Sequence, residues 1–290
     1  MKRILLIALA IVLFLSAVVF AAYPAISNYV NDKYQSKIRT EYEEEVRELD
    51  NSALVKIKEQ AAAYNESLSP VQFDKAGIRD AEQGYHDLLD PSNSGIMGYV
   101  IIPKININLP IYHGTAESVL EEGVGHLIGS SLPVGGESCH SVLTGHSGVA
   151  EKKLFSDLDQ LEVGDRFYLK VLGEYLAYEV TAINTVLPHE TELLELVHGE
   201  DLCTLVTCTP FAVNTHRLLI RGSRVEYQND LEVKQTPDNL TQNEPSSPTK
   251  STWKEQYIAG LKYGALFAGA AILVFLVIVF LRRRRRRKTT

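Results

Sequence analysis

The sequence predicts a mainly β domain that follows a helical segment and lies between two apolar runs. Three patterns support this prediction. Between residues 95 and 227, short β-branched and apolar runs alternate with Gly, Pro and Asn, which is typical of an all-β barrel or sandwich. Before that region, apolar residues recur at helical spacing from Asn28 to Leu68. Each end of the chain carries an uncharged stretch of about 19 residues, close to the length that crosses a bilayer as a helix.

The apolar runs at the two ends predict transmembrane helices in residues 1–22 and 258–281. Two basic residues precede the first run, and a basic tail of six arginines and a lysine, in residues 282–290, closes the second. Basic residues favour the cytoplasmic side of a membrane, so both termini are expected in the cytoplasm and the middle of the chain on the extracellular side of the cell membrane. A cleaved secretory signal is the alternative for the first run, and it would export the middle of the chain equally well.

The composition is that of an ordinary globular protein, with 45% hydrophobic and 22% charged residues. The net charge of −7 conceals a strongly acidic middle part, because nine of the 29 basic residues lie in the two tips. So acidic a middle part disfavours nucleic-acid binding, which needs a basic surface. Three cysteines are too few for a disulfide scaffold, and no metal-ligand cluster or cofactor motif is visible.

Residues 23–94 are expected to form a helical N-terminal region. Aromatic and apolar residues recur at helical spacing up to Asp50, which begins a break with capping potential before the helix resumes. Residues 69–90 show no regular pattern, and a Pro-Ser-Asn-Ser-Gly turn at residues 91–95 leads into the β domain.

Residues 95–227 are expected to form the β domain, and residues 228–257 a polar linker to the second apolar run. The predicted strands are Met97–Ile102, Leu109–Tyr112, Ser141–Thr144, Arg166–Leu172, Leu176–Val186, Leu202–Thr207 and Leu218–Val225. Short helices are expected at Ala116–Glu121, Lys153–Leu158 and Glu192–Val197.

Cys208 is the first candidate for a chemical role. It follows the β-branched stretch Thr204–Thr207, and Pro210 stops the strand two residues later, so the thiol is expected where strand gives way to loop. A regular strand places Cys203 on the opposite face from Cys208. A buried structural cysteine is the alternative interpretation, because a nucleophilic thiol also needs a neighbouring base or cation.

The chain offers eight histidines as the base and Arg217, nine residues after the thiol, as the cation. His140 and His146 lie six residues apart, so an even strand spacing would put both on one face. The residues alone do not choose between these two histidines.

Several segments together resemble the sortases, the cysteine transpeptidases of Gram-positive cell surfaces. Thr-Leu-Val-Thr-Cys at residues 204–208 resembles their cysteine signature, residues 143–146 their histidine segment and residues 214–222 their arginine segment. Residues 96–105 and 109–114 resemble the opening strands of their barrel. The segments follow one another in collinear order, and the resemblance implies a closed β-barrel of the sortase type.

The resemblance implies Cys208 as the nucleophile, His146 as the acid/base and Arg217 as the cation near the thiol and the developing oxyanion. The implied reaction is attack of the thiolate on the Thr–Gly carbonyl of an LPxTG-like sorting signal, followed by resolution of the thioester by an amine. It assigns no role to Cys139 and Cys203, which we expect to be packing residues. A disulfide between them is the alternative in an exported protein.

With a second membrane span, the chain most resembles class C, the pilus-assembling sortases. Class C enzymes usually carry a lid in which an Asp-Pro-aromatic motif covers the cysteine and the arginine. Here the one Asp-Pro, Asp90-Pro91, is followed by Ser92, and Phe73-Asp74 lacks the proline. The lid of the 23–94 region is therefore expected to be altered or missing.

The implied partners are LPxTG-like pilin or surface-protein substrates, an amine from a pilin lysine or a cell-wall peptide, and the membrane lipid bilayer. Other functions stay open. A sortase that attaches surface proteins to cell-wall peptide would differ only in the amine, and a hydrolytic cysteine peptidase would use the same three residues with water. A non-catalytic exported β-barrel adhesin or scaffold would not need Cys208, His146 and Arg217 together.

Overall fold

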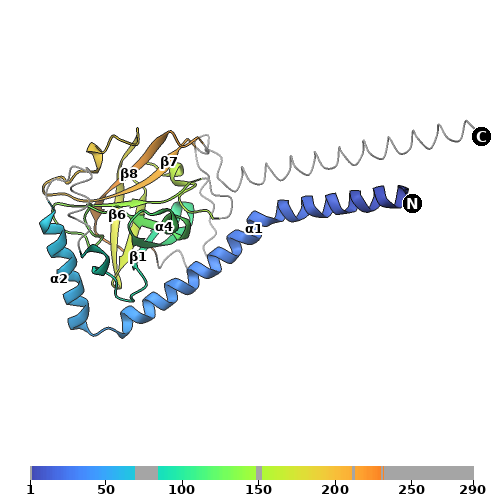
Figure 1. The fold of residues 1–290 in the computed structure, drawn as a ribbon. Helices are drawn as coiled ribbons and strands as arrows, with labels where there is room; N and C mark the ends of the chain where they lie inside the picture. Colours follow the sequence, from blue (N-terminus) through green and yellow to red (C-terminus); the bar gives the residue numbers. More distant parts are fainter. Residues whose placement is uncertain (1, 69–83, 148–151, 211–212, 230, 232–290) are drawn as a thin grey trace, which may run out of the picture. The chain divides into compact units, whose positions relative to one another are not determined.

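The computed structural model describes residues 2–68, 84–147, 152–210, 213–229 and 231 (Figure 1). The chain divides into two compact units, residues 1–30 with 248–290, and residues 31–247. Helix α1 (Lys2–Glu48) begins in the first unit and ends in the second, which holds all the other described elements.

In the described part of the second unit, eight strands close into a barrel in the order β1-β2-β3-β4-β7-β8-β6-β5. The strands are β1 (Ile96–Ile102), β2 (Ile107–His113), β3 (Val124–His126), β4 (Cys139–Thr144), β5 (Arg166–Val171), β6 (Glu174–Val186), β7 (Asp201–Thr209) and β8 (His216–Val225). Neighbouring strands are antiparallel except for the pairs β2–β3 and β4–β7, which are parallel. The closed barrel confirms the predicted fold class, and each predicted strand is present.

The remaining elements are short, apart from α2 (Asn51–Ser67). They are the helix α4 (Glu117–Glu122) and the 3₁₀ turns η1 (Tyr85–Asp87), η2 (Pro103–Ile105), η3 (Leu158–Gln160) and η4 (Glu192–Leu194). The prediction of a helix over Lys153–Leu158 is wrong: Leu154 has φ +40°, outside the helical region, and Phe155 is buried in the core. Strand β3 was not predicted, because three residues are too few to show an alternation.

The barrel interior is a continuous apolar core. Phe167 of β5 stacks on Tyr178 of β6 with ring centroids 5.5 Å apart, and Leu205 and Ile220 are fully buried beside them. Each such side chain contributes about 1.5–3 kcal/mol by leaving water. Gly222 of β8 is required here, because a Cβ at this position would lie 2.6 Å from the Phe167 ring.

Helix α2 packs along the outside of the barrel (Figure 1). Asp50 caps it as expected, since its carboxylate accepts a hydrogen bond from the backbone of Ala53 at 2.7 Å. The Asn65 side chain then bonds both backbone groups of Leu132, at 2.7 and 3.1 Å, and fixes the helix against the chain that leads to β4.

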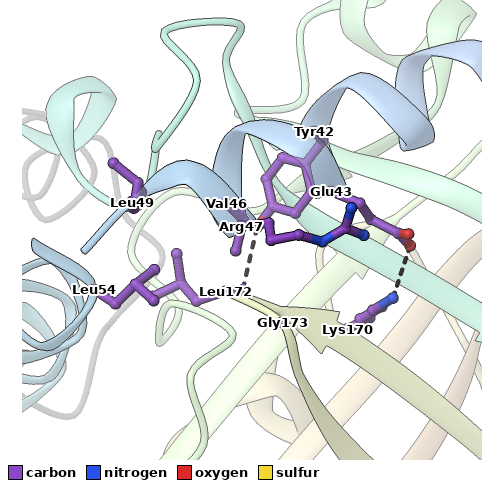
Figure 2. A pocket seen from close by; sticks show the side chains of 9 residues that line it. All are labelled: Tyr42, Glu43, Val46, Arg47, Leu49, Leu54, Lys170, Leu172 and Gly173. Atoms are coloured by element: carbon purple, nitrogen blue, oxygen red, sulfur yellow. Dashed lines mark hydrogen bonds and ion pairs between the residues drawn. The ribbon is translucent and has the colours of Figure 1, made fainter. Parts of the chain in front are cut away.

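The last turns of α1 pack against β1 and the β5–β6 turn. The Tyr42 hydroxyl donates to the carbonyl of Met97 and accepts from the backbone of Leu172, and burial raises the pKa of Tyr42 to about 12. A pocket of about 320 Å³ opens there, with Lys170 paired to Glu43 at 2.7 Å on one side (Figure 2). Its lining is formed by Tyr42, Glu43, Val46, Arg47, Leu49, Leu54, Lys170, Leu172 and Gly173.

The chain just before β1 is anchored by a buried aromatic cluster. The Tyr85 hydroxyl donates to Nδ1 of His126 at 2.8 Å and accepts from the backbone of Gly114 at 3.0 Å. Nε2 of His126 donates to the carbonyl of Ser131 at 2.8 Å. Both rings are fully buried, and this burial lowers the pKa of His126 to about 4. The imidazole is therefore neutral in the folded protein near neutral pH.

Among the described residues, no helix combines the length and the apolar character needed to cross a membrane. The second predicted span and its basic tail, residues 258–290, lie outside the described residues, as does most of the predicted linker. Phe73 and its neighbours in the predicted lid region also lie outside them.

Candidate active site

Cys208 lies at the end of β7, one residue before the strand stops. Strand alternation sends Cys203 and Leu205 into the barrel core, while Val206 packs in a second cluster, with Val142, on the other face. Cys208 shares that outer face, and it is half-buried whereas Cys139 and Cys203 are buried. Of the three thiols it is therefore the one that a substrate can reach.

All three cysteines are free, so the alternative of a Cys139–Cys203 disulfide is not realised. Burial raises the pKa of the Cys203 thiol well above its usual value, and that of Cys139 above its own, with the nearby Asp201 carboxylate adding to both effects. Both side chains therefore stay as neutral thiols, which supports the expected packing role.

Arg217 stands directly opposite Cys208 in the antiparallel pair β7–β8. Opposite residues in such a pair have their Cα atoms about 4.5–5.5 Å apart and their side chains on one face. Nη1 of Arg217 donates to the carbonyls of Asn214 and His216, at 3.3 and 3.1 Å. The connection between the two strands thus holds the guanidinium near the thiol-bearing strand end.

His146 follows β4 by two residues and continues the register of the parallel pair β4–β7. That pair aligns Thr144 with Val206, and the backbone of Gly145 donates to the carbonyl of Val206 at 3.0 Å. The Ser147 hydroxyl then donates to the carbonyl of Cys208 at 2.7 Å. The segment of His146 therefore runs beside Cys208, although the two residues are far apart in the chain.

The loop around His146 is fixed by Phe155. A Cβ at Gly145 would lie 2.7 Å from the Phe155 ring, so glycine allows the ring to pack closely on the backbone just before His146. The backbone of Phe155 donates to the carbonyl of His146 at 2.9 Å, and Thr207 donates to the carbonyl of Gly145 at 2.7 Å. These contacts hold the histidine backbone from both sides.

His140, the other candidate, is a buried residue within β4. Nδ1 contacts the carbonyl of Glu195 at 2.8 Å, and Nε2 contacts the Thr204 hydroxyl at 2.7 Å. Burial lowers the pKa of His140. Both ring nitrogens are therefore occupied by structural contacts, whereas the His146 side chain is 25% exposed.

An acidic side chain that the sequence did not suggest lies beside His146. Oε1 of Glu117, in the first turn of α4, is 3.3 Å from Nε2 of His146. No spacing signal could have found this contact, because Glu117 is one of three glutamates in a short helix and comes from a different part of the barrel.

The carboxylate of Asp90 accepts hydrogen bonds from the backbones of Ser94 and Gly95, both at 3.0 Å, and so closes the turn that leads into β1. In the parts of the chain that the structure describes, no three His, Cys, Asp or Glu side chains form a metal-binding group.

Comparison with known proteins identifies the family. A sortase-domain model matches residues 100–225. Sortase D of Bacillus subtilis is 34% identical over 138 residues, which covers 47% of this chain and 67% of the relative. The crystal structure of sortase C1 from Streptococcus agalactiae is 45% identical, with a TM-score of 0.61, and covers 66% of this chain and 99% of its own. That of sortase C from Streptococcus pneumoniae is 42% identical, with a TM-score of 0.60, and covers 66% and 97%.

These structural neighbours are class C sortases, and each covers 66% of this chain, which is more than the residues 100–225 that the sortase-domain model matches. The similarity in sequence and the similarity in fold thus agree with an arrangement in which Cys208 lies at a strand end beside Arg217 and the segment of His146. The chain belongs to the sortase family and is a cysteine transpeptidase.

Proposed function

We propose that this chain is a class C sortase that polymerises pilin subunits, with Cys208, His146 and Arg217 as its catalytic residues. The observation that carries the proposal is the alignment of Cys208 with Arg217 across β7–β8, next to the segment of His146. The class C structures at 42–45% identity support the pilin assignment, and the pneumococcal relative has pilin substrate specificity.

In the first step the Cys208 sulfur attacks the threonine carbonyl carbon of an LPxTG-like signal. The Thr–Gly C–N bond breaks, His146 gives its proton to the departing glycine amine, and a thioester remains on the sulfur. In the second step a lysine amine of another pilin attacks the thioester. An amide forms, the Cys208 sulfur leaves, and the amine proton passes to His146.

Arg217 stabilises the oxyanion that forms in both steps. Among the described residues, the hydrogen bonds of its guanidinium use Nη1 alone, so its remaining N–H groups can face the substrate oxygen. A donor aimed at a developing oxyanion contributes about 10²–10³ in rate.

The test is a competition between two amines. The full-length chain receives an LPxTG-type peptide together with a purified pilin and a cell-wall stem peptide, and the covalent products are identified by mass spectrometry. We expect the peptide to be joined to a pilin lysine, and we expect no product with Cys208→Ala. Product on the stem peptide alone would instead assign a wall-anchoring sortase, and released free acid alone would assign a hydrolase.

We further propose that residues 1–22 and 258–281 anchor the enzyme in the membrane, with residues 95–227 outside, the linker 228–257 between barrel and membrane, and the tail 282–290 inside. The basic residues at both ends support this topology. Protease added to intact protoplasts should digest the barrel and spare a tag placed after Thr290. Loss of the tag would refute it.

A further inference from the structure

The ring of His146 lies next to a carboxylate that belongs to neither of the strands carrying Cys208 and Arg217. Oε1 of Glu117 is 3.3 Å from Nε2 of His146, within ion-pair distance. The side chain of Glu117 is 76% exposed and that of His146 is 25% exposed, so the contact is open to solvent on the glutamate side.

The scaffold determines the position of Glu117. Helix α4 begins at Glu117, and the carbonyl of Ala116 accepts from the backbones of Val119 and Leu120. Leu120 is buried and reaches β3, where a Cβ on Gly125 would lie 3.1 Å from its Cδ2. Because Gly125 is itself aligned with Thr144 of β4, the helix is tied to the strand that leads to His146.

The charged groups around His146 come from several elements. Cys208 lies beside it at the end of β7, and Arg217 lies opposite Cys208 on β8. Lys152 lies near the other end of α4, where it pairs with Glu122 at 3.2 Å and donates to the carbonyl of Glu121. Among the described residues, Glu117 is the one carboxylate within ion-pair distance of the His146 ring.

We propose that Glu117 is a positioning residue for the transpeptidase reaction, an inference that rests on the proposed role of His146. Its carboxylate directs Nε2 toward α4, which leaves Nδ1 as the nitrogen that exchanges a proton with the thiol and with the departing amine. The same carboxylate stabilises the positive charge that the imidazole carries before it protonates the amine. Arg217 lies on the far side of the thiol in the strand order β4-β7-β8. Its positive charge disfavours the positive charge on the imidazole.

The test compares Glu117→Gln, Glu117→Lys and Glu117→Asp with Glu121→Gln, in the full-length chain. Glu121 lies one turn further along the same helix, so its variant removes an equal charge away from the ring. We expect Glu117→Gln to lower kcat for LPxTG-peptide cleavage about two- to fivefold with KM unchanged, the range of an exposed ion pair. Glu117→Lys should lower kcat further, and Glu117→Asp should keep part of the activity that Glu117→Gln loses.

The split between kcat and KM, together with the partial recovery of kcat in Glu117→Asp, gives a readout that a structural role would not move. Thermal unfolding should be the same for Glu117→Gln and Glu121→Gln.

The positioning role is overturned if Glu117→Gln matches Glu121→Gln in kcat, or if KM rises while kcat holds. Failure of the underlying function has a different signature, because His146→Ala would then still form the thioester. That second result would overturn both proposals, whereas the first would remove the role of Glu117 alone.

Discussion

Cys208 at the end of β7 stands opposite Arg217 of β8, and Arg217 in turn stands opposite Val186 of β6. The guanidinium therefore lies between a thiol and an apolar side chain, on the outer face of the barrel. An arginine in this position has donors within reach of the thiol side, where we propose that a substrate carbonyl is attacked.

Replacing this arginine should slow acyl transfer strongly. Arg217→Ala is expected to lower kcat/KM for an LPxTG peptide by about 10²–10³, the loss typical of a missing oxyanion donor. Arg217→Lys should fall between this variant and the wild type, because an ammonium keeps the charge but not the planar fork. The control is Arg221→Ala, which lies two same-face positions further along β8, opposite Thr204. An equal loss in the control would contradict a specific role for Arg217.

Replacing each of the three cysteines should have a different effect on thioester formation and stability. Cys208→Ala is expected to abolish the thioester that mass spectrometry should detect on the wild type, because its sulfur is the proposed nucleophile. Cys203→Ala and Cys139→Ala should keep it, with about 0.5–3 kcal/mol of stability lost in urea unfolding because both side chains fill buried space. A thioester on Cys208→Ala would refute the assignment.

The two histidines should give opposite phenotypes. His146→Ala is expected to lose at least about 10²-fold in kcat with an unchanged melting temperature, because its side chain is partly exposed. His140→Ala should lower the melting temperature, since it leaves the Thr204 hydroxyl and the Glu195 carbonyl without their buried contact. Loss of activity in His140→Ala but not in His146→Ala would show that the wrong histidine had been assigned.

Much of this arrangement was predictable from the sequence. Short apolar, β-branched runs between Gly, Pro and Asn located the strands, and Pro210 marked the end of β7 and so the position of Cys208. The choice between His140 and His146 was not predictable from spacing, because both lie on one face. Burial distinguishes them, and burial depends on the β6–β7 connection that covers His140 through Glu195.

Other features depended on closure of the barrel, which no local pattern encodes. β3 is three residues long and owes its existence to pairing with β2 on one side and β4 on the other. Glu117 reaches His146 because of that same pairing. The turn at Lys153–Leu158 follows from the burial of Phe155 against Gly145, a tertiary contact that overrides helical spacing.

Acid should destabilise the fold through His126. Its pKa is about 4 in the folded protein because of burial and about 6.5 in an unfolded chain, so below pH 6.5 the unfolded state binds a proton that the folded state does not. The stabilisation is fully present above pH 6.5 and is lost as pH falls toward 4, by about 3 kcal/mol in total.

Urea unfolding at a series of pH values measures this slope. His126→Gln should be less stable at pH 7 but should show a flatter dependence between pH 6.5 and 4. The exposed His189→Gln should keep the wild-type slope. An unchanged slope in His126→Gln would mean that another group, such as the buried His140, carries the effect.

The altered lid motif predicts a weakly closed active site. Replacing residues 69–83 by a Gly-Ser linker should leave the reaction rate of Cys208 with a small thiol reagent nearly unchanged, because no Asp-Pro-aromatic motif is available to cover it. The replacement must end before Tyr85, which is part of the core with Leu89. A rate that rises severalfold would reveal a lid of another composition.

The parallel pairing of β4 with β7 also affects when, during synthesis and folding, Cys208 meets the residues around it. Ser147 and Cys208 are 61 residues apart in the chain but in hydrogen-bond contact, and Arg217 follows later still. Contacts between such distant segments form late, because closing a long loop costs entropy before any contact repays it. A nascent chain that has not yet emerged as far as β8 therefore carries an unassisted thiol, and acyl-transfer competence arrives only with the last strand of the barrel.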